Sequence, residues 1–523
     1  DNPRSSHRVE LMADRLRALV AIRDWSQWTK AVETSKIWLS LSEVSSDGVA
    51  TEQPTSANQV LSKALTSTAL TVADHWYDNH DYTQAISWYD LAATAADAEI
   101  AEQALSGLAW AEFQSRPTAE SEATARVLLD RFSTSPRSAE IGLKLAEQKY
   151  RDGKFEAADE LLQTLLGRFP DWPRRHQLHA LHAKLLARNV EPAAKQQAIE
   201  ALNAALSTLE AMPSETSDLQ EQKWTSTATY VYELAWLYHD SGQTESANRA
   251  FERINVNHPT SRYWADTTIR LAQAHFSQGR LPAAIDLLQQ LIGEPRPAEV
   301  ETEEVRTPAG VPALSASFRN SEGDSDTHVM NGAETQHSIV SEEIKCQALY
   351  LRAMIAVAEK DWPSAATWSQ RVVDEYPKHR LRWMSQFWNG EALFRQRQFG
   401  MAVEQLSEVL PRTDAQNDPW VAMAHLRLAQ SLGHLDRWEE VLVIAEPAKR
   451  RFVDFAQAYE LDYLIGRALA TEARFPQARA AYQQVIDSPA GKTSETAAMA
   501  QWMIGETYFH QEQYALAAEA YHR

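Results

Sequence analysis

The chain has 523 residues, and its 51 lysines and arginines against 71 aspartates and glutamates give a formal net charge of −20. This length exceeds what one hydrophobic core supports, and the acidic balance disfavours binding to nucleic acid or anionic lipid, which both depend on basic side chains. The single cysteine, Cys346, excludes a disulfide framework and a cysteine-rich zinc site. No apolar run approaches the ~20 residues that a membrane-spanning helix needs.

The first 60 residues predict a helical hairpin followed by a linker. Residues 1–41 are expected to form an irregular N-terminal hairpin, and residues 42–60 include the polar run SEVSSDGVATEQPTSANQ, which favours a loop. The chain starts at Asp1 without a methionine, which leaves open a removed signal peptide or a piece cut from a longer protein.

Beyond the linker, small residues occur in pairs whose two members are twelve positions apart. The pairs are Ala73 and Ala85, Ala146 and Ala158, Ala235 and Ala247, Ala272 and Ala284, Ala353 and Ala365, Gly390 and Ala402, Gly466 and Ala478, and Gly505 and Ala517. A large apolar residue usually stands three positions before the second member, as Phe155 and Phe475 do. In some pairs a proline follows the second member by twelve positions, as Pro170 does.

This spacing predicts pairs of antiparallel helices. Alanine or glycine lets two helix backbones approach closely, so the two small residues mark the point where the helices cross. Proline ends the second helix because it cannot continue the backbone hydrogen-bond ladder. We therefore expect an all-α fold of about twelve hairpins, each of about 34 to 40 residues. Their second-helix positions are Ala31, Ala85, Ala125, Ala158, Ala198, Ala247, Ala284, Ala365, Ala402, Val441, Ala478 and Ala517.

An insertion is expected to separate the hairpins into two arrays. The N-terminal array is predicted over residues 61–292 and the C-terminal array over residues 342–523. The residues between them, 293–341, are acidic and proline-rich and lack apolar periodicity, which predicts disorder. The last hairpin stops at Arg523 within its second helix, a pattern typical of an array truncated at its end.

The sequence predicts no catalytic residue, no cofactor site and no metal site. The sequence contains no phosphate-binding glycine loop and no metalloprotease or serine-hydrolase motif. Cys346 is expected to be a helix-packing residue because nothing near it would activate a thiol. His176, His179 and His182 share one helical face, but the outer two are about 9 Å apart along the helix. A solvated or packed face is therefore favoured over a zinc or copper site.

The repeat pattern resembles the tetratricopeptide repeat (TPR) family. The stretch EIGLKLAEQKYRDGKFEAADELLQTLLGRFP, residues 140–170, is similar to the family's consensus, and so is QWMIGETYFHQEQYALAAEAY, residues 501–521. The resemblance implies a right-handed α-solenoid that binds other proteins in a concave groove and catalyses no reaction. Some relatives grip a C-terminal carboxylate with Lys, Arg and Asn, but the equivalent positions here hold Tyr, Phe, Met and Glu, so that mode is not expected.

The resemblance also implies which residues face the groove. When each hairpin is numbered so that its small residues fall at positions 8 and 20, residues at positions 5, 9 and 12 point inward, and many of them are aromatic, as Tyr77 is at position 12. Aromatic side chains contribute a large contact area at low entropic cost. The alternative is that these rings only pack between adjacent first helices. The candidate partner-binding residues are Tyr232, Trp236, Phe276, Tyr350, Phe387, Phe394, Tyr463, Trp502 and Phe509.

The linkers between hairpins extend the resemblance. RFPDWPRR, NHPTSRYWAD and EYPKHRLRWM are similar to linkers of bacterial cell-envelope TPR proteins, of the outer-membrane assembly lipoprotein and Tol–Pal-associated types. We therefore expect a noncatalytic scaffold that binds a protein or peptide segment in the bacterial cell envelope or periplasm, with peripheral or lipid-anchored association if a leader was removed. The alternatives are a cytoplasmic location, and a regulatory or substrate-recruiting arm of a larger enzyme whose catalytic domain lies outside this chain.

Overall fold

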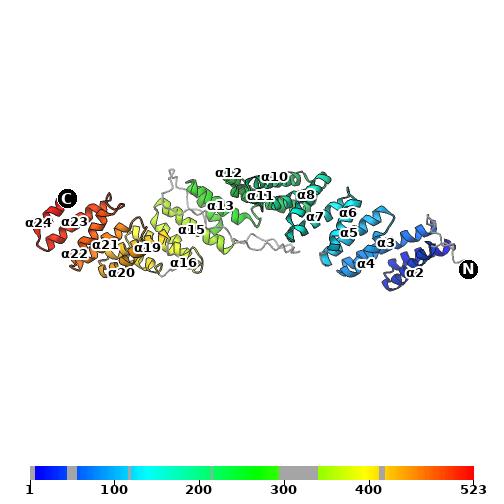
Figure 1. Cartoon of the computed structure of the whole chain (residues 1–523), viewed down its shortest axis with the longest axis horizontal. Coiled ribbons are helices and arrows are strands. Elements are labelled where there is room, and N and C mark those ends of the chain that lie inside the picture. The colour runs from blue at the N-terminus through cyan, green and yellow to red at the C-terminus, as the bar shows by residue number, and fades with distance from the viewer. Residues whose placement is uncertain (1–5, 44–55, 116–118, 214–215, 294–339, 411–417) are drawn as a thin grey trace. The chain divides into compact units, whose positions relative to one another are not determined.

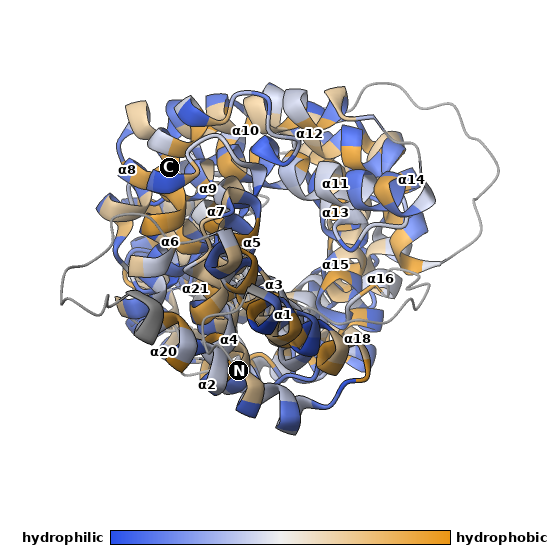
Figure 2. Cartoon of the chain, turned by 90° about the vertical axis from the view of Figure 1, so that its right-hand side faces the viewer, coloured by the Kyte–Doolittle hydropathy of each residue, from blue (hydrophilic) through white to orange (hydrophobic). Residues whose placement is uncertain are grey.

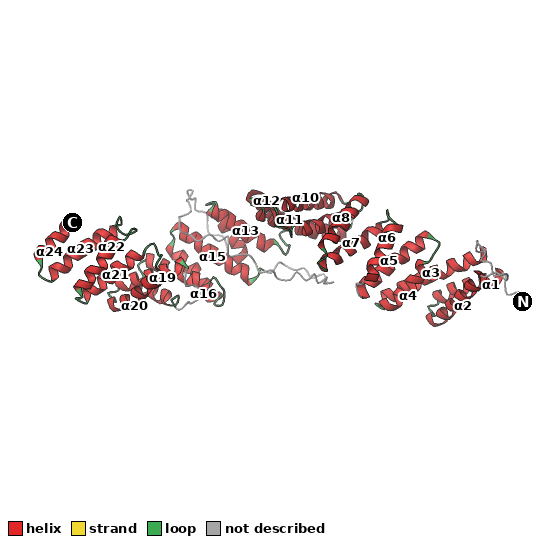
Figure 3. Cartoon of the chain, in the orientation of Figure 1, coloured by secondary structure: helices red, strands yellow, loops and turns green. Residues whose placement is uncertain are grey.

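The computed structural model describes residues 6–43, 56–115, 119–213, 216–293, 340–410 and 418–523, and these residues form 24 helices and no strand (Figure 3). The first twelve helices are α1 (Ser6–Ala21), α2 (Trp25–Glu43), α3 (Ser56–Asp78), α4 (Tyr82–Ala93), α5 (Ala98–Ser115), α6 (Ala119–Arg131), α7 (Pro136–Arg151), α8 (Phe155–Arg168), α9 (Arg175–Leu186), α10 (Pro192–Ala211), α11 (Ser217–Asp240) and α12 (Thr244–Asn257). The others are α13 (Trp264–Ser277), α14 (Leu281–Ile292), α15 (Glu342–Glu359), α16 (Trp362–Glu375), α17 (Arg382–Arg395), α18 (Phe399–Ser407), α19 (Pro419–His434), α20 (Trp438–Arg451), α21 (Ala458–Thr471), α22 (Phe475–Asp487), α23 (Glu495–His510) and α24 (Tyr514–His522).

These helices alternate as the first and second members of hairpins, as the spacing of small residues predicts. The chain divides into two compact units, residues 1–247 and 248–523, and the boundary falls inside α12. Within each unit a hairpin packs on the next one along the chain, as α3 to α6 do in the first unit and α19 to α24 in the second (Figure 1). The expected all-α solenoid of repeated hairpins is confirmed.

The small residues lie where the two helices of a hairpin cross. Ala146 on α7 and Ala158 on α8 are both fully buried, and so are Ala272 and Ala284 in the second unit. At Gly390 an added Cβ would stand 2.5 Å from Cγ of Leu406 on the facing helix. A side chain larger than a methyl group therefore has no room at these crossings, which is why alanine and glycine recur there.

The turn inside most described hairpins has one residue in the left-handed region, five positions before the second small residue. Glycine supplies this conformation at Gly153, Gly242 and Gly279. Other residue types supply it elsewhere, with φ near +60°, namely His80, Lys360, Arg397, Asp436, Ala473 and Glu512. The conserved place of this residue in the hairpin shows that one turn geometry recurs along the chain.

The first hairpin uses this turn in a different register from the one predicted with Ala31. Its left-handed residue is Arg23, so the residue five positions later, at the helix crossing, is Trp28. The backbone N–H of Trp28 donates to Asp24 O at 2.9 Å, just as Ala85 N donates to Asp81 O. Trp28 is fully buried and packs edge-on against Trp88 at 4.8 Å. A tryptophan thus fills the crossing that alanine occupies elsewhere, and counting from alanines misplaces it by three residues.

Two predicted segments, the linker and the insertion, can be compared with the ends of the helices. The linker predicted over 42–60 is shorter, because α2 runs to Glu43 and α3 begins at Ser56; residues 44–55 lie outside the described ranges. Most of the predicted insertion, 294–339, also lies outside them. At its two ends, Gly293 closes α14 in a left-handed conformation and the Ser341 hydroxyl accepts from the N–H of Ile344, which caps α15.

The two helices of a hairpin occupy different layers. First helices pack on the next first helix, as α3 does on α5 and α5 on α7, and as α17 does on α19 and α19 on α21. Within the described ranges no comparable contact joins successive second helices. A row of helices that touch one another must lie on the inner side of a curved array, so the first helices line the inner side in each unit. Single helices carry both hydrophobic and hydrophilic stretches, as Figure 2 shows.

Candidate binding surface

The inner layer presents side chains from one face of each first helix. Positions 2, 5, 9 and 12 of a hairpin are spaced by three or four residues, so they share one helical face. We call this face the first-helix surface. Aromatic and polar side chains gather on it in both units, and the two units are described separately below.

In the first unit a pocket opens on the first-helix surface between α3 and α5. Tyr77 of α3 and Tyr89 of α4 form part of its lining, together with four residues of α5. Those four are Ser106, Gly107, Trp110 and Gln114. Counted from the buried pair Ala109 and Ser121, Ser106 and Trp110 fall at positions 5 and 9, and Tyr77 falls at position 12 of the preceding hairpin. The pocket therefore lies at the place where a segment running across the first helices would pass.

Tyr89 forms a fixed wall of this pocket. Its side chain is 3% exposed, and its ring lies so close to Gly107 that a Cβ there would stand 2.4 Å from the ring's Cε1. Its hydroxyl donates a hydrogen bond to Oδ1 of Asp74 at 2.7 Å. The ring of Tyr77 stands 6.5 Å away at an angle of 66°. The absence of a side chain at Gly107 is thus what allows two aromatic walls to meet at this point.

Carboxylates on α3 make the pocket's surroundings acidic. Asp74 and Asp78 lie one helical turn apart, and both residues are exposed. Partial burial of its carboxyl group against Tyr89 raises the pKa of Asp74, the hydrogen bond from Tyr89 lowers it in part, and the charge of Asp78 raises it further. Burial also raises the pKa of Tyr89, as does its hydrogen bond to Asp74. The raised pKa of Asp74 thus reflects mainly the partial burial of its carboxyl group, and the charge of Asp78 adds to it.

Trp110 is a lining residue that counting from pairs of small residues does not find. Counting from Ala125 misplaces this hairpin by four residues, because the buried residues Ser121, Ala125 and Leu128 of α6 match Ala158, Leu162 and Leu165 of α8. The helices therefore cross at Ala109 and Ser121, which are both buried, and Trp110 falls at position 9. Serine in place of alanine or glycine is why the pairs of small residues do not reveal this hairpin.

In the second unit the first-helix surface is organised by a buried carboxylate. Glu391 of α17 is 5% exposed and accepts hydrogen bonds from Nε of Arg395 at 2.8 Å and from Nε of Arg427 at 2.6 Å. The guanidinium of Arg427, on α19, also lies 5.1 Å from the centroid of the Phe394 ring. Because Glu391 and Arg427 stand on adjacent first helices, this pair holds α17 and α19 in register.

The network continues to the next first helix. Arg427 donates from a terminal guanidinium nitrogen to Oε1 of Gln430 at 2.8 Å, and Nε2 of Gln430 donates to Oε2 of Glu460 on α21 at 2.6 Å. Tyr463, also on α21, has its ring 5.9 Å from that of Tyr482. A continuous line of polar groups flanked by aromatic rings thus crosses α17, α19 and α21.

The nine aromatic residues singled out from the sequence differ in how much surface they offer. Trp502 and Phe509 on α23 are 55% and 52% exposed, and Tyr232, Trp236, Phe394 and Tyr463 are half-buried. Phe276, Tyr350 and Phe387 are buried among the packed helices. The structure brings Tyr232 and Trp236 together, with ring centroids 6.3 Å apart. These three buried rings offer little surface to a partner.

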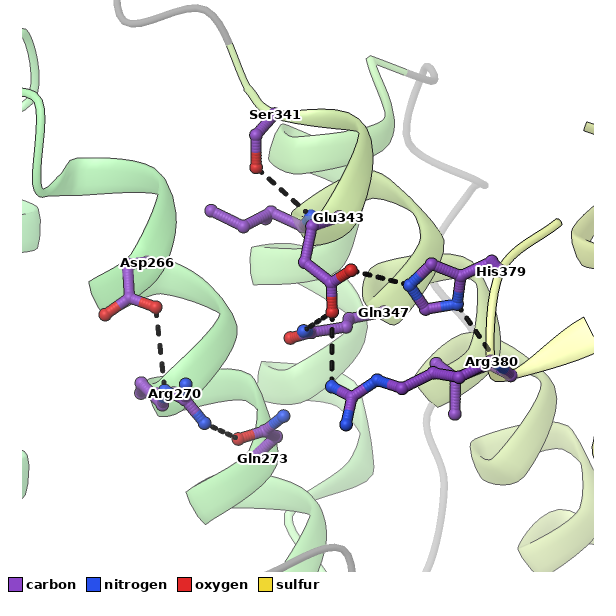
Figure 4. Close-up of polar contacts among 10 residues, drawn as sticks. Asp266, Arg270, Gln273, Ser341, Glu343, Gln347, His379 and Arg380 are labelled. Atoms are coloured by element: carbon purple, nitrogen blue, oxygen red, sulfur yellow. Dashed lines mark hydrogen bonds and ion pairs between the residues drawn. The ribbon is translucent and has the colours of Figure 1, made fainter. Parts of the chain in front are cut away.

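A second polar cluster ties the start of α15 to the segment before α17 (Figure 4). Oε2 of Glu343 lies 2.6 Å from Nε2 of His379, and Oε1 accepts from Arg380 at 3.2 Å and from Gln347 at 2.6 Å. The backbone N–H of Leu381 donates to Nδ1 of His379, which assigns the proton to Nε2. Burial raises the pKa of Glu343, but the hydrogen bonds from His379 and Gln347 outweigh it and leave the pKa lowered. Every group has a protein partner, so the cluster serves packing.

The three histidines of α9 do not converge on one point. Nδ1 of His176 lies 2.9 Å from the Tyr230 hydroxyl on α11, whereas Nε2 of His182 lies 3.1 Å from Oδ1 of Asp159 on α8. Burial lowers the pKa of His176 and of His179 to about 4. Within the described ranges no group of three or more His, Cys, Asp or Glu residues could hold a metal ion.

Cys346 lies in the core of the second unit. It is fully buried on α15, and burial, with the charge of Glu343 nearby, raises the pKa of its thiol to about 12. A thiol with so high a pKa is not a nucleophile near neutral pH.

Family models place this repeat architecture in a known class. Residues 141–171 and 232–299 match two models described as tetratricopeptide repeat, and residues 336–506 match one described as tetratricopeptide repeat-like domain. The chain therefore contains TPR domains in both units. Such repeats indicate a scaffold for protein–protein interaction.

Solved structures similar to this chain are also TPR proteins or sensors. A tetratricopeptide repeat protein from Parabacteroides merdae is 12% identical with a TM-score of 0.32, over 63% of this chain and 98% of its own. The C-terminal part of a TPR repeat-containing protein from Cytophaga hutchinsonii is 10% identical with a TM-score of 0.32, over 68% and 98%. The apo quorum sensor NprR from B. thuringiensis is 10% identical with a TM-score of 0.31, over 70% and 93%.

A comparison with curated proteins found no match. Of the helices in the described ranges, none has the length and apolar character needed to span a membrane.

Proposed function

We propose that this chain is a noncatalytic scaffold that binds a segment of another polypeptide along its first-helix surface. The observation that carries the proposal is the pocket between α3 and α5, in whose lining Ser106, Trp110 and Tyr77 stand at positions 5, 9 and 12 of their hairpins. The half-buried rings of Phe394 and Tyr463 occupy positions 12 and 5 in the second unit. The TPR matches support the same role.

The chemistry of this surface suits a polypeptide better than a small metabolite. Aromatic rings supply contact area, and amide side chains such as Gln114 and Gln430 both donate and accept, as a peptide backbone requires. These groups are spread along several helices of each unit, and an extended ligand is what can reach more than one of them. The buried Cys346, with its raised pKa, offers no nucleophile.

Site-specific photocrosslinking tests this proposal. A photoreactive phenylalanine analogue is placed at Gln114 or at Phe509, both exposed on first helices, and at Gln163 or Val443, exposed on second helices, as matched controls. The proposal expects crosslinked partner bands in cells from the first pair of sites and none from the second pair. Equal crosslinking from both pairs, or none from either, would contradict it.

We further propose that the scaffold works in the bacterial cell envelope. The support is the resemblance of the linkers RFPDWPRR, NHPTSRYWAD and EYPKHRLRWM to those of envelope TPR proteins. The test is fractionation of cells that express the full gene with a C-terminal tag. Recovery of the tagged protein with the periplasmic or membrane fraction supports the proposal, and recovery with the cytoplasmic fraction overturns it.

A further inference from the structure

We propose that the pocket between α3 and α5 holds the cationic side chain of an arginine or lysine from the bound polypeptide, so that the partner segment is basic at this point. This inference rests on the proposed function and adds the chemistry of the partner. It is carried by three features of the pocket: its aromatic walls, its acidic surroundings and its polar floor.

The aromatic walls are arranged as a cation requires. Tyr77, Tyr89 and Trp110 all line the pocket, and the planes of the two tyrosine rings differ by 66°. The two tyrosine rings meet edge-on and Tyr89 is 3% exposed, so the ring faces open to a cation are those of Tyr77 and Trp110, and a cation within about 6 Å of such a face is attracted by it. The chain's own Lys144 already places its Nζ 5.8 Å from the centroid of Trp110, which shows that an ammonium group can approach this ring. Lys144 is also held by Glu147, 3.7 Å away.

The surroundings add charge complementarity. Asp74 and Asp78 are exposed on α3, and Asp74 stands beside the pocket because it accepts the hydrogen bond of Tyr89. A cation in the pocket would lie near both carboxylates, because the charges of Asp74 and Asp78 both act on Tyr89. The chain as a whole carries a formal charge of −20, which favours encounter with basic segments.

Other occupants fit this pocket less well. An acidic side chain would be repelled by Asp74 and Asp78. A purely apolar side chain would desolvate the Ser106 hydroxyl and the Gln114 amide, which is hydrogen-bonded to Tyr77, and would offer neither of them a hydrogen bond. A guanidinium or ammonium group offers hydrogen bonds to those oxygens while its aliphatic stem packs on the rings.

The test begins with peptides selected from a random twelve-residue library against the full chain. Binding of a selected peptide is then measured by calorimetry, with its basic residue intact and with arginine replaced by citrulline, which has the same shape without the charge. Three variants are compared with the unchanged chain: the double variant Asp74→Asn with Asp78→Asn, the single variant Trp110→Met, and Asp286→Asn. Asp286 is exposed on α14 in the other unit and serves as a control for the loss of an exposed carboxylate away from the pocket.

We expect selected peptides to share arginine or lysine at one position. Citrulline at that position should weaken binding to the unchanged chain by about tenfold. The double variant and Trp110→Met should reduce this preference to about twofold or less, whereas Asp286→Asn should retain it. Trp110→Met leaves the carboxylates intact, so the two variants test the rings and the charges independently. Circular dichroism confirms that each variant folds.

The outcomes separate this inference from the proposed function. Peptides that bind with no basic preference, or a citrulline effect that persists in both pocket variants, overturn the inference and leave the proposed function standing. If no selected peptide binds the chain, the proposed function falls together with the inference.

Discussion

The ring of Tyr482 on α22 lies directly against the backbone of Gly466 on α21: a Cβ added to Gly466 would stand 2.5 Å from the ring's Cε1. Tyr482 is fully buried. Gly505 has the same relationship with Tyr521 in the last hairpin, and Gly390 has it with Leu406. The close contact of a glycine with a large side chain sixteen residues later is therefore a repeated element of the hairpins.

Gly466→Ala is expected to destabilise the second unit by roughly 1–3 kcal/mol, because the added methyl group overpacks the contact with Tyr482. The control is Gly400→Ala on α18, where an added Cβ meets nothing within 4 Å. Alanine forms helix better than glycine, so the control should be neutral or stabilising by up to about 1 kcal/mol. Urea unfolding measures both, and equal stability of the two variants would contradict the packing described.

Ala158→Leu should destabilise the first unit by a similar amount, roughly 1–3 kcal/mol, because Ala158 is fully buried where α8 crosses α7. Ala123→Leu on α6 is the matched control, since Ala123 is exposed and its substitution should stay within about 0.5 kcal/mol. Thermal unfolding followed by circular dichroism compares the two. An unchanged melting temperature for Ala158→Leu would show that the helices cross elsewhere.

Removing the buried carboxylate of Glu391 should cost more than removing an exposed one. Glu391→Ala leaves Arg427, which is 15% exposed, without its carboxylate, and about 2–3 kcal/mol of stability should be lost. Glu446→Ala breaks an exposed pair with Arg450 at 3.9 Å, and its effect should stay within about 0.5 kcal/mol. Urea unfolding measures the loss of unfolding free energy in each variant, and similar losses for both would argue against a buried network.

Much of the fold follows from the sequence because its cause is local. A crossing that admits only a methyl group or a hydrogen leaves alanine or glycine at a fixed spacing, and this spacing locates hairpins such as α7–α8 and α21–α22. The spacing of small residues does not locate the first hairpin correctly, because Trp28 fills its helix crossing. Only the left-handed Arg23 reveals the register of this hairpin. Where a bulky residue replaces a small one, the spacing carries no signal.

The candidate site is less predictable from sequence. A position in the repeat indicates the face on which a side chain lies, but exposure depends on the neighbouring hairpin. Phe387 and Trp502 share position 5, yet Phe387 is 3% exposed and Trp502 is 55% exposed. The pocket in the first unit needs three helices and the missing side chain of Gly107, and no single repeat contains all of these elements.

The first unit should lose stability in mild acid through its histidines. Burial, with Arg174 nearby, lowers the pKa of His176 to about 4, and burial lowers that of His179 to about 4, both from an ordinary 6.5. The unfolded chain therefore binds protons near pH 6.5 that the folded chain binds only near pH 4. Stability from this source is complete above pH 6.5 and is lost as the pH falls toward 4, by roughly 3 kcal/mol for the buried His176 and by less for the half-buried His179.

The double variant His176→Gln with His179→Gln isolates this effect. Its free energy of unfolding should change less between pH 7 and pH 4 than that of the unchanged chain, because other titrating groups are common to both. His7→Gln, at an exposed residue of α1, is the control and should keep the original slope. Parallel pH profiles for the double variant and the unchanged chain would refute the assignment.

The left-handed turns have a practical consequence for protein engineering. Seven of them hold a residue other than glycine, and a Cβ in this conformation costs about 1 kcal/mol. Ala473 and Glu512 are examples whose replacement by glycine should raise the melting temperature, and gains at distant turns should add. A chain with several such replacements would be more stable, so that destabilising substitutions on the first-helix surface could be studied without unfolding the protein.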